Sequence, residues 1–189
     1  MPALRSIERE HRDGGRTLII LTSPHTRRTL AIGRAIGRAA PDGGVIAFHG
    51  DLGAGKTTLA KGIAQGLGIG EPVISPTYTI ISEYPGRLRL VHIDAYRLSG
   101  EEEFAQTGGQ DLLGMPGTLS LVEWSERVEE LLPRERQRIS ITIEENGDRL
   151  FILEGDWLEA LDWRRFSIPR LEAAREGTPG GAVRRRGIQ

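Results

Sequence analysis

Residues 50–58 read Gly-Asp-Leu-Gly-Ala-Gly-Lys-Thr-Thr and match the pattern GxxxxGK[ST] in full. They follow the short apolar run Val45 to Phe48 and precede a helix-like stretch from Thr57 to Leu67, which is the strand–loop–helix setting that gives the pattern its meaning. Glycines let the backbone wrap tightly and turn several N–H groups toward one point. The following helix adds the positive end of its dipole, so these residues predict a loop that binds the phosphates of a nucleotide.

Two side chains of this loop carry chemistry of their own. Lys56 would reach the β- and γ-phosphates as a point charge, and the hydroxyl of Thr57 would ligate Mg²⁺. The chain has only two lysines, Lys56 and Lys61, among 25 basic residues, so a lysine at this position points to a chemical requirement. The alternative is an ordinary glycine-rich turn, and the strand–loop–helix context argues against it.

Composition sets the outer limits. The length of 189 residues suits one domain with a real core. The chain has no cysteine, which excludes disulfides and cysteine-based zinc sites and suits a reducing cytosol. Residues 1–15 are charged and polar, unlike a signal peptide, and no apolar run is long enough to span a bilayer. The net charge of −1 gives no broad basic field for nucleic-acid binding. We therefore expect a cytoplasmic protein with no membrane partner.

Strand-like and helix-like segments alternate along the chain. Strands are expected at residues 17–21, 45–48, 77–84, 88–93, 119–122, 139–143 and 150–153. Helices are expected at residues 24–40 with Ser23 as the cap, and at residues 57–67, 101–106, 125–132 and 156–163. Turn residues at Pro85-Gly86 and Asn146-Gly147 each indicate a hairpin. The pattern predicts an α/β fold of the P-loop NTPase type, with three layers and a mixed, partly antiparallel central sheet.

The two ends of the chain differ from the middle in composition. Residues 1–16 form an amino-terminal extension that we expect to be flexible, and residues 17–169 form the domain that carries the phosphate loop. From about residue 170 onward Gly, Pro and Arg dominate without an apolar period. We therefore expect residues 170–189 to be a disordered tail.

A phosphate loop needs a partner carboxylate that holds or orients the metal, usually at the end of an apolar strand. Two candidates fit this description, because residues 90–94 end in Asp94 and residues 119–123 end in Glu123. Either carboxylate alone could be a helix cap or a surface residue. An unperturbed carboxylate is a weak base toward water, so metal binding or water positioning is favoured over outright proton abstraction.

The segment Ser75-Pro76-Thr77-Tyr78-Thr79 lies between the loop helix and the next strand. Many nucleotide hydrolases place there a switch segment that senses the γ-phosphate through a hydroxyl. The alternative is a turn that enters a strand, since Thr and Tyr favour β-structure in any case.

Four motifs occur together and in a fixed order: residues 50–58, Ser75 to Thr79, His92-Ile-Asp-Ala-Tyr-Arg-Leu98 and Leu121-Val-Glu-Trp124. In this combination the chain resembles the TsaE family, the bacterial ATPases of tRNA threonylcarbamoyladenosine biosynthesis. The resemblance covers roughly residues 21 to 153. Each motif apart from the phosphate loop is modest, but their combination is highly specific.

The resemblance implies a small P-loop ATPase whose nucleotide cycle supports a TsaB–TsaD complex, which attaches threonylcarbamoyl to adenosine 37 of tRNA. It implies ATP and Mg²⁺ as cofactors, and contact with tRNA that is indirect or weak. The residues that match the family's phosphate loop are Gly53, Ala54, Gly55, Lys56, Thr57 and Thr58. By the same match, Thr57 and Glu123 would ligate Mg²⁺, and Asp94 would be the catalytic or water-orienting carboxylate beside Lys56.

Further residues enter through the resemblance alone. Trp124 matches the family's functional tryptophan near the nucleotide, although packing in the core or at the rim is an alternative. Ser75 to Thr79 would be a switch-like loop at the partner interface, and Thr26 would lie near the adenine. The arginines at 184–186 have no family counterpart; a solvated tail is favoured there over a contact with tRNA.

Other classes of protein share the phosphate loop. A GTPase should carry an Asn-Lys-x-Asp motif, but the chain's one asparagine is Asn146, in an expected turn. A small-molecule kinase would use a carboxylate to orient an acceptor hydroxyl, and it usually needs an arginine-bearing lid, for which residues 101–115 are a poor candidate. A nucleotide sensor that binds without turnover is a third possibility. Phosphate release, transfer to a metabolite, or binding alone would separate the three classes.

Overall fold

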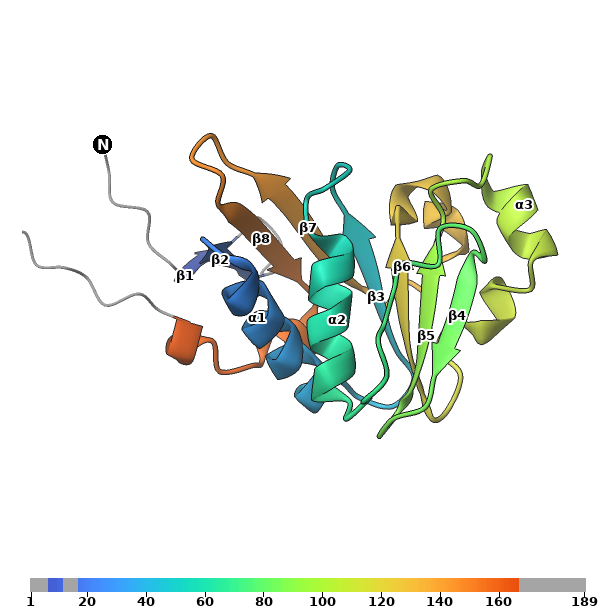
Figure 1. Cartoon of the computed structure of the whole chain (residues 1–189), viewed down its shortest axis with the longest axis horizontal. Coiled ribbons are helices and arrows are strands. Elements are labelled where there is room, and N and C mark those ends of the chain that lie inside the picture. The colour runs from blue at the N-terminus through green and yellow to red at the C-terminus, as the bar shows by residue number, and fades with distance from the viewer. Residues whose placement is uncertain (1–6, 12–16, 167–189) are drawn as a thin grey trace, which may run out of the picture.

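The computed structural model describes residues 7–11 and 17–166. The described strands form one mixed sheet in the order β1-β2-β8-β7-β3-β6-β5-β4 (Figure 1). Their bounds are β1 Ile7–His11, β2 Thr17–Ser23, β3 Gly44–His49, β4 Ile81–Tyr84, β5 Arg89–Asp94, β6 Thr118–Glu123, β7 Gln137–Ile143 and β8 Arg149–Glu154. The four central strands β7, β3, β6 and β5 run parallel, and all other pairings are antiparallel. The prediction of a mixed α/β sheet is therefore confirmed.

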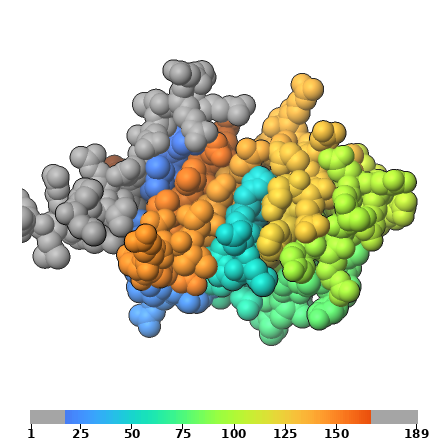
Figure 2. Space-filling view, turned by 90° about the horizontal axis from the view of Figure 1, so that it is seen from above, coloured from blue at the N-terminus to red at the C-terminus, as the bar shows by residue number. Residues whose placement is uncertain are grey.

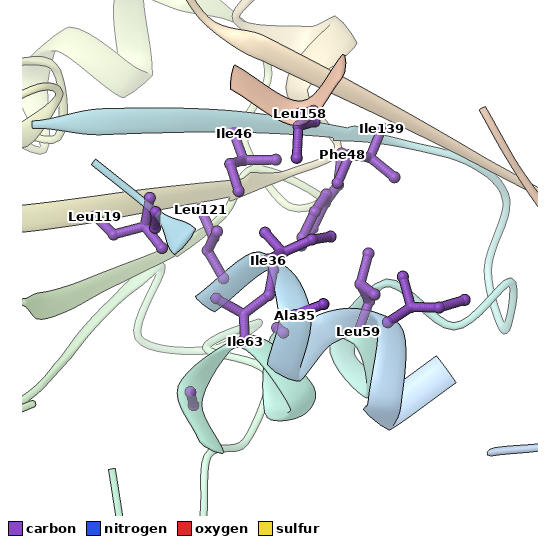
Figure 3. Packing of buried hydrophobic residues seen from close by; sticks show 14 of the residues in the cluster. Ala35, Ile36, Ile46, Phe48, Leu59, Ile63, Leu119, Leu121, Ile139 and Leu158 are labelled. Atoms are coloured by element: carbon purple, nitrogen blue, oxygen red, sulfur yellow. The ribbon is translucent and has the colours of Figure 1, made fainter. Parts of the chain in front are cut away.

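Two helices pack side by side on one face of the sheet (Figure 1). They are α1, Thr26–Ala39, and α2, Lys56–Gly66. Figure 3 shows Ile36 of α1, Ile63 of α2 and Phe48 of β3 in the apolar core between the helices and the sheet. Burial of such side chains is the main favourable term in folding, at roughly 25 cal/mol per Å² of apolar surface. The core therefore fixes the position of α2, the helix that follows the phosphate loop.

Glycine lets α1 and α2 approach each other unusually closely. Gly33 and Gly37 on α1 face Gly62 and Gly66 on α2, and the residues on both helices are four apart, which places them on one helical face. A Cβ atom on Gly37 would lie only 2.1 Å from the carbonyl oxygen of Ile63. No side chain fits there, so backbone packs against backbone.

The other face of the sheet is covered over β4, β5 and β6. The short helix α3, Glu101–Gln106, contributes Phe104 to a second apolar cluster. Val128 and Leu132 also join it; they directly follow two 3-10 turns, Ser125–Arg127 and Glu129–Leu131. Helical structure on both faces gives the three layers expected from the sequence.

Several predicted boundaries were wrong. The segment predicted as a strand from residue 77 enters the sheet only at Ile81, and residues 125–132 form the two 3-10 turns instead of one α-helix. The last helix, α4, is limited to Asp156–Glu159. The cap of α1 is His25, whose Nδ1 accepts from the backbone N–H of Arg28, and not the predicted Ser23.

The expected ends of the domain also differ from the structure. Residues Ile7–His11, predicted to lie in a flexible extension, pair antiparallel with β2 and so extend the sheet by one strand. The predicted tail, residues 170–189, and its arginines lie outside the described residues. Both hairpins are confirmed, since β4 pairs with β5 and β7 pairs with β8. None of the helices in the described part of the chain is long and apolar enough to cross a membrane.

Candidate functional site

The phosphate loop connects the carboxyl end of β3 to the first turn of α2, as predicted. Its three glycines Gly50, Gly53 and Gly55 have φ angles of 138°, 78° and 113°. Side chains rarely adopt such backbone angles, which explains why glycine occupies these positions. Gly50 also has no room for a side chain, because a Cβ atom would lie 2.3 Å from the carbonyl oxygen of Ile141. Figure 2 looks onto this end of the sheet, with the loop (cyan) between the β7–β8 hairpin (orange) and the segment after β6 (gold).

A cavity of about 360 Å³ opens beside the loop. It is lined by Leu52, Gly53, Gly55, Lys56, Thr57, Thr58, Ser75, Thr77, Asp94, Tyr96, Glu123 and Trp124. Ten of these residues were predicted from the sequence to belong to one site, and they come from four separate segments of the chain. A second cavity of similar volume lies between residues 134–138 and 154–159 and contains none of the predicted residues.

Thr57 and Glu123 meet across this cavity. The Thr57 hydroxyl lies 3.0 Å and 3.2 Å from the two carboxylate oxygens of Glu123. The first residue belongs to α2 and the second to the end of β6, 66 positions apart in the chain. A hydroxyl and a carboxylate are the hard oxygen ligands that Mg²⁺ prefers, together with water and phosphate oxygens. Among the described residues, no group of three or more His, Cys, Asp or Glu side chains could hold a metal ion. Thr57 and Glu123 could hold a Mg²⁺ whose other ligands are water and phosphate oxygens.

Asp94 holds the segment that was predicted to act as a switch. Its Oδ2 accepts hydrogen bonds from the hydroxyls of Ser75 and Thr77, at 2.6 Å and 2.7 Å. Its Oδ1 accepts from the backbone N–H of Tyr96 at 3.0 Å. The carboxylate is buried, so these three donors replace the water that it has lost. Asp94 therefore connects the end of β5 to the loop between α2 and β4.

Lys56 curls back onto its own loop. Its ammonium group donates to the carbonyl oxygens of Gly50 and Asp51 and lies 4.0 Å from the centre of the Trp124 ring. Burial lowers the pKa of Lys56, while the nearby carboxylates, Glu123 foremost, act in the opposite direction. The aromatic face and the two carbonyls thus hold the cation beside the cavity that Lys56 lines.

Comparison with known proteins identifies the family to which this chain belongs. The family described as "Threonylcarbamoyl adenosine biosynthesis protein TsaE" matches residues 23–151. The chain belongs to the TsaE family. A TsaE protein of Treponema pallidum is 42% identical over 117 residues, 62% of this chain and 86% of its own length. A TsaE protein of Bacillus subtilis is 46% identical over 121 residues, 64% of this chain and 73% of its own.

A solved structure of similar sequence shares the fold of this chain. The crystal structure of YdiB from Bacillus subtilis superimposes with a TM-score of 0.62 and 36% sequence identity, covering 74% of this chain and 86% of that one. The expected P-loop NTPase-like fold is thereby confirmed. Membership of the TsaE family places the chain in tRNA threonylcarbamoyladenosine biosynthesis.

Some residues predicted for the TsaE site do not line the cavity. Thr26 is exposed at the start of α1, and Ala54 is buried beneath the phosphate loop. Within the switch-like segment Pro76 is buried, whereas Tyr78 and Thr79 are exposed, Tyr78 with 87% of its surface accessible to solvent. The proximity of Thr26 to an adenine stays a prediction.

Two residues of this TsaE site were missed. Tyr96 packs its ring against Trp124, with centroids 4.9 Å apart, and His92 hydrogen-bonds Glu123 from the interior. Both lie in the motif from residue 92 to residue 98. Period-two alternation could have identified His92, because residues 92 and 94 of one strand point to the same face. Tyr96 follows the end of the strand, where sequence periodicity does not indicate to which side a side chain points.

Proposed function

We propose that this TsaE protein binds ATP and hydrolyses it with the help of Mg²⁺, in support of a TsaB–TsaD complex that modifies adenosine 37 of tRNA. The observation that carries the proposal is the contact between Thr57 and Glu123 at the first turn of a phosphate-loop helix. The family's place in tRNA modification supports the partners and a cytoplasmic location, where tRNA is found.

Each residue then has a defined task. The backbone N–H groups of residues 53–58 and the ammonium of Lys56 bind the phosphates. Thr57 and Glu123 hold the magnesium, which supplies charge neutralisation of the phosphates when it is bound. To bind phosphate, Lys56 exchanges its two carbonyl partners in the loop for phosphate oxygens, a change that needs only side-chain rotation.

Asp94 is suited to orienting the attacking water. In this structure both of its oxygens accept hydrogen bonds from protein groups. A water molecule can reach the carboxylate once Ser75 or Thr77 turns its hydroxyl away. We therefore propose that hydrolysis requires a rearrangement of the switch-like segment, which fits slow turnover in the isolated chain and faster turnover when a partner rearranges that segment.

Phosphate release at varied Mg²⁺ tests the proposal directly. Glu123→Gln should lower magnesium-dependent phosphate release at least tenfold, about 1.4 kcal/mol in transition-state free energy, and leave magnesium-free nucleotide binding close to that of the unaltered protein. Glu130→Gln, at an exposed glutamate after the same strand, is the matched control and should behave normally. Transfer of phosphate to a metabolite, or binding without any turnover even with TsaB and TsaD, would contradict the proposed activity.

A further inference from the structure

His92 lies behind the magnesium pair and has no part in the function proposed above. It sits in the middle of β5, with its side chain fully buried. Its Nε2 lies 2.8 Å from Oε1 of Glu123, whose side chain is itself only 4% exposed. Residues 92 and 94 share one face of β5, and Glu123 is the register partner of Asp94 on β6. His92 is thus a diagonal neighbour of Glu123 on the same face of the sheet.

The direction of this hydrogen bond follows from the chemistry of the two groups. An ionised carboxylate can only accept, so Nε2 carries the hydrogen and donates it. Among the described residues the other ring nitrogen, Nδ1, has no hydrogen-bond partner and is buried. The contact with Glu123 therefore requires a hydrogen on Nε2 of His92.

The two side chains that contact Glu123 differ in whether they line the cavity. Thr57 lines the cavity and contacts both carboxylate oxygens, while His92 does not line the cavity and contacts Oε1 alone. His92 is therefore not placed to touch a metal or a nucleotide. It holds Oε1 from the buried side chain of β5 and makes no hydrogen bond to Oε2.

We propose that His92 is a positioning residue for the magnesium site: by donating to Oε1 it fixes the rotamer of Glu123 and so prepares the carboxylate for the metal. This inference rests on the proposed role of Thr57 and Glu123 as magnesium ligands. A carboxylate that is held before the metal arrives loses less rotamer freedom on binding, and hydrogen bonds behind metal ligands commonly raise metal affinity 10- to 100-fold.

Three substitutions of His92 distinguish a role in positioning Glu123 from a role in packing alone. His92→Gln can place an amide N–H near the position of Nε2 and should retain the hydrogen bond. His92→Leu fills much of the same space without a donor. His92→Asn is polar but too short to reach Glu123, because its amide falls near the position of Nδ1. The Asn variant also replaces the Leu variant if the latter fails to fold.

The readout is the affinity for ADP by calorimetry, measured with saturating Mg²⁺ and with a chelator. The ratio of the two affinities reports magnesium binding without any need for turnover. We expect this ratio to fall about 10- to 100-fold in His92→Leu and His92→Asn. In His92→Gln it should stay within about threefold of the ratio for the unaltered protein. The ADP affinity measured in chelator should be unchanged in all three variants. The melting temperature without nucleotide shows that each variant is folded.

The outcomes distinguish this inference from the function on which it rests. If the unaltered protein shows no magnesium effect on ADP affinity, the proposed magnesium site itself is wrong. If the unaltered protein shows the effect and His92→Leu and His92→Asn keep it in full, His92 does not position Glu123. Equal loss in His92→Gln and His92→Leu, or equal loss with and without magnesium, would identify His92 as a packing residue only.

Discussion

The close packing of α1 against α2 makes Gly37→Ala a sharp test of how the fold positions the site. The new methyl carbon would lie 2.1 Å from the carbonyl oxygen of Ile63, 2.9 Å from its carbonyl carbon and 3.0 Å from Cα of Gly66. All three atoms belong to the backbone of α2, so no side chain can move aside. The two helices must separate by roughly 1 Å to restore normal contact distances, and both of their hydrophobic faces lose packing against the sheet.

The magnitude follows from two opposing terms. Overpacking of this kind typically costs about 1–3 kcal/mol and occasionally more, and a clash with rigid backbone belongs at the upper end, about 3 kcal/mol. Alanine favours the helix over glycine by about 1 kcal/mol. The net destabilisation is therefore about 2 kcal/mol, which lowers the melting temperature by roughly 4–8 °C in a domain of this size.

The assay is thermal and urea unfolding of Gly37→Ala beside a matched Gly70→Ala control. Gly70 has no atom within 4 Å of an added Cβ and no positive φ, so its alanine variant should be neutral or slightly more stable. Displacement of α2 should also separate Thr57 from Glu123 and weaken magnesium-dependent ADP binding. Equal stability of the two variants would refute the argument that backbone contact between the glycines sets the position of α2.

Two further predictions concern the ends of the central strands. Asp94→Asn should weaken the charge-assisted hydrogen bonds that hold Ser75 and Thr77. Amide hydrogen exchange of residues 74–78 should therefore accelerate in the nucleotide-free protein, and phosphate release should fall. Unchanged exchange would show that Asp94 does not hold this segment. Burial lowers the pKa of His49 from its ordinary value near 6.5, so the unfolded chain binds a proton more readily than the folded protein does. The contribution of the neutral His49 ring to folding stability is therefore complete above about pH 6.5. This contribution is lost as the pH falls toward the lowered pKa. The urea midpoint of the unaltered protein should therefore drop more between pH 8 and pH 5.5 than that of His49→Gln, and equal drops would contradict this assignment.

The phosphate loop and the two strand-end carboxylates could be predicted from the sequence because their signals are local. The spacing of glycines, the lysine and the hydroxyl in residues 50–58 encodes a backbone path that needs no distant partner. Asp94 and Glu123 follow apolar runs, and parallel strands end at one edge of a sheet, so their proximity is a consequence of topology. The register confirms it, since β5 and β6 place the two residues directly opposite each other.

Features that depend on tertiary contacts could not be predicted in this way. Residues 125–132 have the composition of a helix, but Trp124 before them has a φ of 58° and Ser125 bonds the carbonyl oxygen of Phe48, so the chain turns tightly along the sheet. Residues 77–80 favour β-structure, yet Thr77 is drawn toward Asp94 and leaves the strand. In both places a distant hydrogen bond overrides local propensity.

The arrangement of donors around the two carboxylates suggests how the site divides its work. Asp94 and Glu123 lie opposite each other and are both buried, yet they share no donor among the described residues. Glu123 accepts a hydrogen bond from Thr57 of the phosphate-loop helix, and Asp94 accepts hydrogen bonds from Ser75 and Thr77 of the switch-like segment. A ligand that engages the Thr57 hydroxyl therefore leaves the hydrogen bonds of Asp94 intact, and the switch-like segment moves only when a second event removes its hydroxyls from that carboxylate. The neighbouring strands β5 and β6 thus hold two contacts that can be released separately. The proposed nucleotide binding and the rearrangement of the segment would then occur as distinct steps.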